Sequence, residues 1–113
     1  IHSEDKQLLE KVISIIKDNI DNEELRPGFL ADKLGMNLRS FYRYFKNFSD
    51  MAPSDFIKDY RLMYAAQLLR TTKLNVQEII YKTGFTNKSY FYREFLKKHN
   101  MTPKEYRQQE EVL

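Results

Sequence analysis

Two short stretches of the sequence, about 50 positions apart, place positively charged and aromatic side chains at helical spacing. On a helix of 3.6 residues per turn, the cationic side chains of each stretch share one face and phenylalanines occupy the opposite face. Arginine can donate to the edge of guanine, and tyrosine can touch a thymine methyl group or a phosphate. Each stretch therefore presents a polar face that could enter a DNA groove, formed by Arg39, Tyr42 and Arg43 in the first and by Lys88, Ser89, Tyr92 and Arg93 in the second.

A second set of residues is suited to bind phosphates, which position a protein on nucleic acid without specifying the sequence. Some carry charge, and others lie where the exposed N–H groups of a helix start can meet an anion. We predict phosphate contacts for Lys46, Lys97, Lys98, Asn37, Thr86 and Asn87. The alternative interpretations are simpler: helix caps for Asn37, Thr86 and Asn87, solvated arginines, and tyrosines lying against the surface of their own subdomain.

An internal repeat favours the functional interpretation. Residues 30–35 match residues 79–84 at an offset of 49, and the offset becomes 50 after one extra residue in the second turn. A short helix, a glycine turn, an aromatic and basic helix and a Met-x-Pro stop then recur in the same order. The matched pairs include Phe41 with Phe91, Tyr42 with Tyr92, Arg43 with Arg93, Phe45 with Phe95, Met51 with Met101, and Pro53 with Pro103.

The hydrophobic periodicity predicts an all-α fold with seven helices. We expect helices over residues 5–20, 27–35, 38–48, 55–71, 76–83, a sixth after Gly84 that reaches residue 98, and 103–109, with Ser54 capping the fourth. They form one DNA-binding domain, 1–113, in which helix-turn-helix subdomains 5–51 and 73–109 are joined by a linker helix, 52–72. That linker spans roughly 25–30 Å, close to one turn of B-DNA at about 34 Å.

Composition and charge exclude several other classes of protein. The net charge of the 113 residues is +3, but the first 26 residues carry −3 and the remainder +6, which favours an anionic partner for the later part. The chain has no cysteine, so no thiolate metal site is expected, and we predict no cofactor. No apolar run approaches the ~18 residues of a membrane span. His2 and His99 are the only histidines, and we find no catalytic constellation and predict no enzyme activity.

The sequence resembles the AraC/XylS family of bacterial transcription regulators over residues 7–108. The resemblance rests on a signature around the second basic helix and on the linker helix. Its residues are Gly84, Phe85, Tyr90, Phe91, Arg93, Glu94, Phe95, Met101, Thr102, Pro103, Tyr106 and Arg107, with Tyr60, Arg61, Leu62, Ala65, Ala66, Gln67, Leu68 and Leu69. The resemblance implies sequence-specific binding to double-stranded DNA, with the second helix of each subdomain reading bases in successive major grooves. Carried over by position, it implies that the base-reading residues are Arg39, Tyr42 and Arg43 in the first subdomain and Lys88, Ser89, Tyr92 and Arg93 in the second.

The opening segment, from Asp5 to Ile16, is similar to domains that end hybrid two-component regulators. The resemblance therefore implies effector, receiver or kinase domains upstream of Ile1, and RNA polymerase as a further candidate partner. It implies a cytoplasmic, nucleoid-associated domain without membrane contact of its own, in a protein that is membrane-anchored if it is a hybrid sensor.

The sequence departs from the family pattern in three ways. Asp50 and Asn100 stand where a glycine is usual, and we expect both to accept the left-handed backbone conformation. Leu96 replaces a usual basic residue that the first copy keeps as Lys46. Ser89 matches Arg39, so the two basic helices should prefer different bases.

Two other functions fit a basic helical domain. One is a protein-interaction module whose basic faces dock an acidic partner, and the other is an RNA-binding domain. The duplication of the basic face at the reach of one DNA turn favours DNA. A salt titration with duplexes separates the three, because specific DNA binding weakens steeply with salt and still prefers one sequence.

Overall fold

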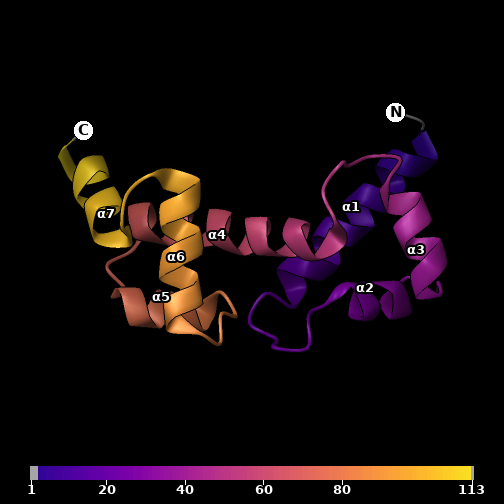
Figure 1. Ribbon diagram of the computed structural model, residues 1–113, viewed down its shortest axis with the longest axis horizontal. Coiled ribbons are helices and arrows are strands. Elements are labelled where there is room, and N and C mark those ends of the chain that lie inside the picture. The colour runs from indigo at the N-terminus through magenta and orange to yellow at the C-terminus, as the bar shows by residue number, and fades with distance from the viewer. Residues whose placement is uncertain (1–2, 113) are drawn as a thin grey trace. The chain divides into compact units, whose positions relative to one another are not determined.

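The computed structural model describes residues 3–112, and its regular structure within that range is entirely helical (Figure 1). The all-α prediction is confirmed, and the number of helices in the described range is the predicted seven. They are α1 (Ser3–Asp18), α2 (Pro27–Lys33), α3 (Leu38–Phe45), α4 (Pro53–Thr71), α5 (Val76–Lys82), α6 (Lys88–His99) and α7 (Pro103–Val112).

The fold divides into two compact units, one ending at Lys58 and the other beginning at Asp59. The first unit contains α1, α2, α3 and the opening of α4. The second contains the remainder of α4 with α5, α6 and α7. Each unit has its own hydrophobic core, built around the helix that carries the predicted DNA-contacting residues.

The core of the first unit is assembled on the phenylalanines of α3. Phe41 and Phe45 are buried, and the Phe45 ring lies 4.8 Å from Phe48 and 5.3 Å from Phe56, centre to centre. The core residues from the other elements are Val12, Ile16, Leu25, Leu30, Ala31 and Ile57. The prediction that phenylalanines occupy the face of this helix opposite its cations is confirmed, and that face is buried.

The second unit repeats that design with α6 in place of α3. Phe91 and Phe95 are fully buried, and α4 supplies the small buried residues Ala65 and Ala66. The remaining members of this cluster are Leu62, Leu68, Leu69, Ile79 and Ile80. Burial of each large apolar side chain contributes roughly 1.5–3 kcal/mol, so these contacts fix the orientation of α6.

The last helix is attached to the end of α4 by two arginines. Arg107 of α7 donates from Nε to the carbonyl oxygen of Leu69 (3.1 Å) and from Nη2 to that of Thr72 (3.2 Å). Carbonyls at a helix C-terminus lack intrahelical partners, so Arg107 satisfies groups that would otherwise need water. Arg70 donates to the Tyr106 hydroxyl at 2.6 Å, which ties α4 to the same face of α7.

Local signals at the helix ends were correct in most cases. Gly35 and Gly84 end the two short helices with φ of 69° and 82°, a conformation that glycine adopts without a steric penalty. Asn100 takes the predicted left-handed conformation, with φ of 58°. Asp50 does not adopt a positive φ, so the expectation for that residue was wrong. The segment between α3 and α4 is instead stabilised by Ser49, whose Oγ accepts from the Met51 N–H at 3.1 Å.

Several helix bounds differ from the predicted ones. α3 ends at Phe45 and not at residue 48, because the following N–H groups of Asn47 and Phe48 bond to carbonyls three residues back and tighten the turn. α4 begins at Pro53, since proline suits the first position of a helix, and the predicted cap Ser54 therefore lies inside the helix. α1 is shifted to Ser3–Asp18, and α7 continues to Val112.

His99, at the end of α6, does not behave as a helix-terminal residue favoured by the helix dipole. Its ring packs 4.4 Å from Phe95 and 4.9 Å from Tyr106, and its Nε2 atom is buried without a hydrogen-bond partner. Burial lowers the pKa of His99, and the charges of Lys98 and Arg70 lower it further, while Asp59 opposes them. Desolvation therefore outweighs the dipole, and the neutral imidazole is favoured in the folded state.

We expect this lowered pKa to make folding sensitive to acid. Above the unfolded-state pKa, near 6.5, His99 is neutral in both states; as pH falls below it, the unfolded chain takes up the proton more readily. Stability is therefore lost between about pH 6.5 and the lower folded-state pKa. Urea unfolding at pH 7.5, 6.5 and 5.5 should show a smaller loss for His99→Phe than for the unaltered chain. The control is His2→Gln, and an unchanged pH dependence in His99→Phe would contradict the assignment.

Candidate nucleic-acid interface

The first basic face is created by the way α3 begins and packs. Asn37 precedes the helix in an extended conformation, and its Oδ1 accepts from the Ser40 N–H at 2.8 Å. Phe41 and Phe45 then turn inward. This leaves the four predicted DNA-contacting residues of the helix and its end, Arg39, Tyr42, Arg43 and Lys46, exposed. The structure therefore brings these residues together on the surface of α3.

The second face follows the same construction in α6. Asn87 caps the helix, its Oδ1 accepting from the Tyr90 N–H at 2.8 Å, and Phe91 and Phe95 fill the core. The predicted residues Lys88, Ser89, Arg93 and Lys97 are exposed, as are Thr86 and Asn87 at the helix start. Tyr92 is half-buried, because its ring packs edge-on against Phe91 at 5.8 Å.

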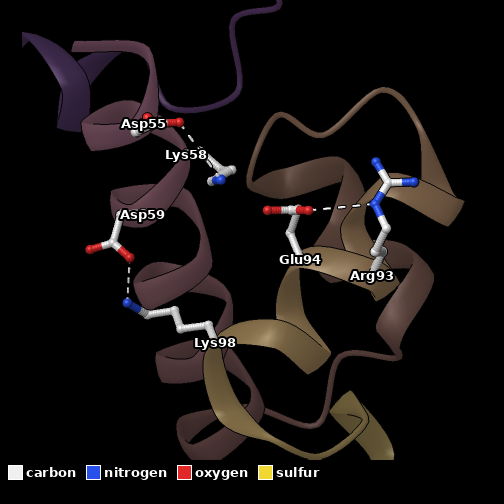
Figure 2. A network of polar contacts seen from close by, with 6 residues as sticks. All are labelled: Asp55, Lys58, Asp59, Arg93, Glu94 and Lys98. Carbon is white, nitrogen blue, oxygen red and sulfur yellow. Dashed lines mark hydrogen bonds and ion pairs between the residues drawn. The ribbon is translucent and has the colours of Figure 1, made fainter. Parts of the chain in front are cut away.

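Two of the predicted cations in the second unit have carboxylate partners, as Figure 2 shows. Lys98 forms an ion pair with Asp59 of α4, and Nε of Arg93 lies 3.5 Å from Oε2 of Glu94. A phosphate contact by Lys98 must compete with Asp59, which makes Lys97 the better placed of the two lysines. Sequence reasoning missed the Lys98–Asp59 pair, since its partners are 39 positions apart.

Sequence reasoning also missed the contacts between these cations and neighbouring tyrosine rings. The Arg43 guanidinium carbon lies 5.6 Å from the centre of the Tyr44 ring, and the Arg93 carbon lies 5.3 Å from that of Tyr90. Lys88 Nζ lies 6.0 Å from the Tyr92 ring. These distances are within the range of cation–π attraction. The available signal was the i,i+3 and i,i+4 spacing of Tyr90 with Arg93 and of Lys88 with Tyr92.

A hollow of about 400 Å³ opens beside the first basic face. It is lined by residues from the end of α3 and the start of α4: Tyr42, Phe45, Lys46, Ser49, Asp50, Met51, Ala52 and Pro53. Tyr42 and Lys46 therefore border a concave surface as well as the exposed face of α3. Leu96, which matches Lys46 in the repeat, is 48% exposed on α6 and adds an apolar element to the second face.

Other kinds of site find no support in the part of the chain that the structure describes. Among residues 3–112, no group of three or more histidine, aspartate or glutamate side chains is arranged to hold a metal ion. In the same range no helix combines the length and the apolar character that crossing a membrane requires.

Each unit thus presents a capped helix that follows a glycine turn, with a buried phenylalanine pair on one side and exposed cations on the other. That arrangement defines the class of helix-turn-helix DNA-binding domains. A helix-turn-helix domain family matches residues 30–109 of the chain. The chain belongs to this family, in its AraC type, which comprises DNA-binding domains of transcription regulators.

Two solved structures and one curated relative are similar to the chain over most of its length. An AraC-type transcriptional regulator from Chromobacterium violaceum superposes with a TM-score of 0.85 at 28% identity, covering 96% of each chain. The C-terminal domain of the two-component response regulator YesN from Fusobacterium nucleatum gives a TM-score of 0.78 at 30% identity, covering 87% of this chain and 95% of that one. Histidine kinase P4 from Formosa agariphila is 39% identical over 94% of this chain, which spans only 8% of that relative's length.

We expect the paired asparagine caps to contribute measurably to the stability of their units. Replacing an N-cap residue by alanine typically costs about 0.5–2 kcal/mol, because an N–H group at the helix start loses its acceptor. Asn37→Ala and Asn87→Ala should each lower the free energy of unfolding in urea by an amount in this range. The matched controls Asn37→Asp and Asn87→Asp keep an acceptor oxygen and should stay close to the unaltered chain. Equal losses in the alanine and aspartate variants would show that the caps are not responsible.

Proposed function

We propose that this domain binds double-stranded DNA sequence-specifically as the output domain of a bacterial transcription regulator, with α3 and α6 entering successive major grooves. The observation that carries the proposal is the repeated construction of the two helices. Each is capped by an asparagine, is held by two buried phenylalanines, and exposes a basic face. An accidental basic patch would not recur with the same cap and the same core contacts.

The length of α4 is compatible with this mode of binding. Its 19 residues correspond to about 28 Å at 1.5 Å per residue, near the ~34 Å of one DNA turn. A single chain would then contact two half-sites in the manner of a dimer. This supports a model in which the two basic helices, which we call the reader helices, recognise separate half-sites of one operator.

The predicted residues divide into two roles under this proposal. Arg39, Arg43 and Arg93 donate to base edges, whereas Ser89 gives the second reader helix a different preference from that of the first. Tyr42, Tyr92 and Lys88 complete the two base-reading faces. Phosphates are held by Lys46 and Lys97, and by the N–H groups near the helix starts at Asn37, Thr86 and Asn87, while Lys98 contributes only when it leaves Asp59.

The relatives suggest the setting in which the domain works. One is named a histidine kinase and another a two-component response regulator, so we propose that receiver or kinase domains, or an effector domain, precede Ile1 in the full protein. Transcriptional output would then involve RNA polymerase as a further partner. We place the domain in the cytoplasm at the nucleoid, and we assign it a binding function and no catalytic one.

The first test of the proposal removes one arginine from each reader helix. Arg43→Ala and Arg93→Ala should each reduce specific affinity by about 1–3 kcal/mol and relax the sequence preference at separate positions about one helical turn apart. The operator is obtained by in vitro selection from a random duplex library, and affinities are measured on duplexes that each carry one changed base pair. The control is Lys11→Ala, which removes an exposed charge from α1.

Two outcomes would contradict the model of two reader helices. One is a footprint confined to a single groove and unaffected by substitution of Arg39 or Arg43. The other is affinity for an acidic protein or for RNA that exceeds affinity for every selected duplex, since it would favour the alternative partners.

The second test concerns the phosphate contacts at the matched positions 46 and 96. Lys46→Ala should weaken binding to all duplexes alike and reduce the slope of log affinity against log salt by about 1, because one fewer counterion is released. Leu96→Lys should have the opposite effect on affinity and slope. Titrations from low to high salt with the selected duplex and a scrambled one measure both quantities. A changed base preference in Lys46→Ala would show that this lysine reads bases.

A further inference from the structure

The two arginines that match in the repeat are held by different neighbours. Arg93 lies over the ring of Tyr90, one helical turn earlier, at 5.3 Å, and Arg43 lies over the ring of Tyr44, the next residue, at 5.6 Å. Neither supporting tyrosine is present in the other copy, since Ser40 stands at the position of Tyr90 and Glu94 stands at the position of Tyr44. The matched arginines therefore lie over different neighbours, Arg93 over a residue one turn earlier and Arg43 over the residue that follows it.

The ring that supports Arg93 is itself braced by the core. Tyr90 is half-buried, and its ring lies 6.3 Å from Phe85, which packs edge-on against the buried Phe91 at 5.0 Å. Tyr44 is 42% exposed. Because a braced ring holds a cation in a narrower range of positions than an exposed ring does, Arg93 is the more constrained of the two arginines.

Glu94 is a second neighbour that restricts the orientation of the Arg93 guanidinium. The Arg93 Nε atom lies 3.5 Å from Oε2 of Glu94, whose side chain is only 9% exposed, whereas the Arg93 side chain is 66% exposed. Figure 2 shows Nε turned toward the carboxylate and the two terminal nitrogens of the guanidinium turned away from it. The free end of the fork, which could donate to a guanine edge, is thus left available.

We propose that Tyr90 and Glu94 are positioning residues that pre-organise Arg93 for base recognition in the second reader helix. Less side-chain freedom is then lost on binding, and the arginine discriminates between bases better than a freely moving one. Arg43, which lies over a different and more exposed ring, contacts a base at a different place relative to the start of its helix. This inference rests on the proposed DNA-binding function and adds that the two half-sites are read at non-equivalent positions.

The test separates positioning from direct contact by a double-mutant cycle on the full chain. Tyr90→Leu keeps apolar bulk against Phe85 but removes the aromatic face, and Tyr90→Phe keeps the face and removes only the hydroxyl. Each is made in the unaltered chain and in Arg93→Ala. Affinities are measured on the selected duplex and on single base-pair variants of it, and far-UV circular dichroism and thermal unfolding monitor the fold.

Tyr90→Leu should lower discrimination about two- to fivefold at the base pair where Arg93→Ala abolishes preference, the range expected for an exposed cation–π contact. Discrimination at other base pairs should stay unchanged. Tyr90→Phe should retain discrimination, Glu94→Gln should lower it at the same base pair, and Tyr90→Leu should have no effect in the Arg93→Ala background. Tyr44→Leu, the matched change in the first reader helix, should have the smaller effect.

Three outcomes overturn the inference while leaving the proposed function in place. They are a loss in Tyr90→Leu that persists in Arg93→Ala, a loss in Tyr90→Leu that is uniform across all duplexes, and unchanged discrimination in both Tyr90→Leu and Glu94→Gln. A selection that yields no preferred sequence for the unaltered chain overturns the proposed function and this inference with it. If Tyr90→Leu fails to fold, the inference is tested by the base-pair discrimination of Glu94→Gln and Tyr44→Leu.

Discussion

The burial of a phenylalanine pair in each reader helix is the constraint on which the remainder of the interface depends. α3 has only 8 residues and α6 has 12, lengths at which an isolated helix is marginal in water. Their stability and their rotation about the helix axis therefore come from packing. Once Phe41 and Phe45, or Phe91 and Phe95, occupy the core, the residues on the opposite side can only face outward. The same contacts thus form the core and determine which face each helix exposes.

Much of the fold followed from the sequence because the strongest signals are local. The spacing of the phenylalanines identified the buried faces, and the cap interpretation of Asn37 and Asn87 is confirmed, since their side chains accept from the N–H groups of Ser40 and Tyr90. The end of α3 and the neutral state of His99 could not be predicted. Both depend on how a turn tightens or a ring is desolvated after distant segments have packed, and neither leaves a pattern in the neighbouring residues.

The sequence predicted which residues of the candidate interface are exposed, but it predicted less well which side chains contact one another. Exposure of Arg39, Arg43, Lys88 and Arg93 follows from the position of the core. The partner of Lys98 did not follow, since Asp59 lies on another helix and many other carboxylates were equally plausible from the sequence. Base and phosphate contacts themselves remain predictions, because they are properties of a complex with DNA.

The two reader helices differ in how many acidic residues accompany their cations, and this difference favours a different role for each. In the first reader helix and its end, Arg39, Arg43 and Lys46 are accompanied by no acidic residue between positions 37 and 48. In the second, Glu94 lies beside Arg93, and Asp59 pairs with Lys98. A cation that already has a carboxylate neighbour gains less from a phosphate, yet its geometry is better defined. The first unit is accordingly suited to electrostatic attachment, and the second to discrimination by a side chain whose direction is set before DNA arrives.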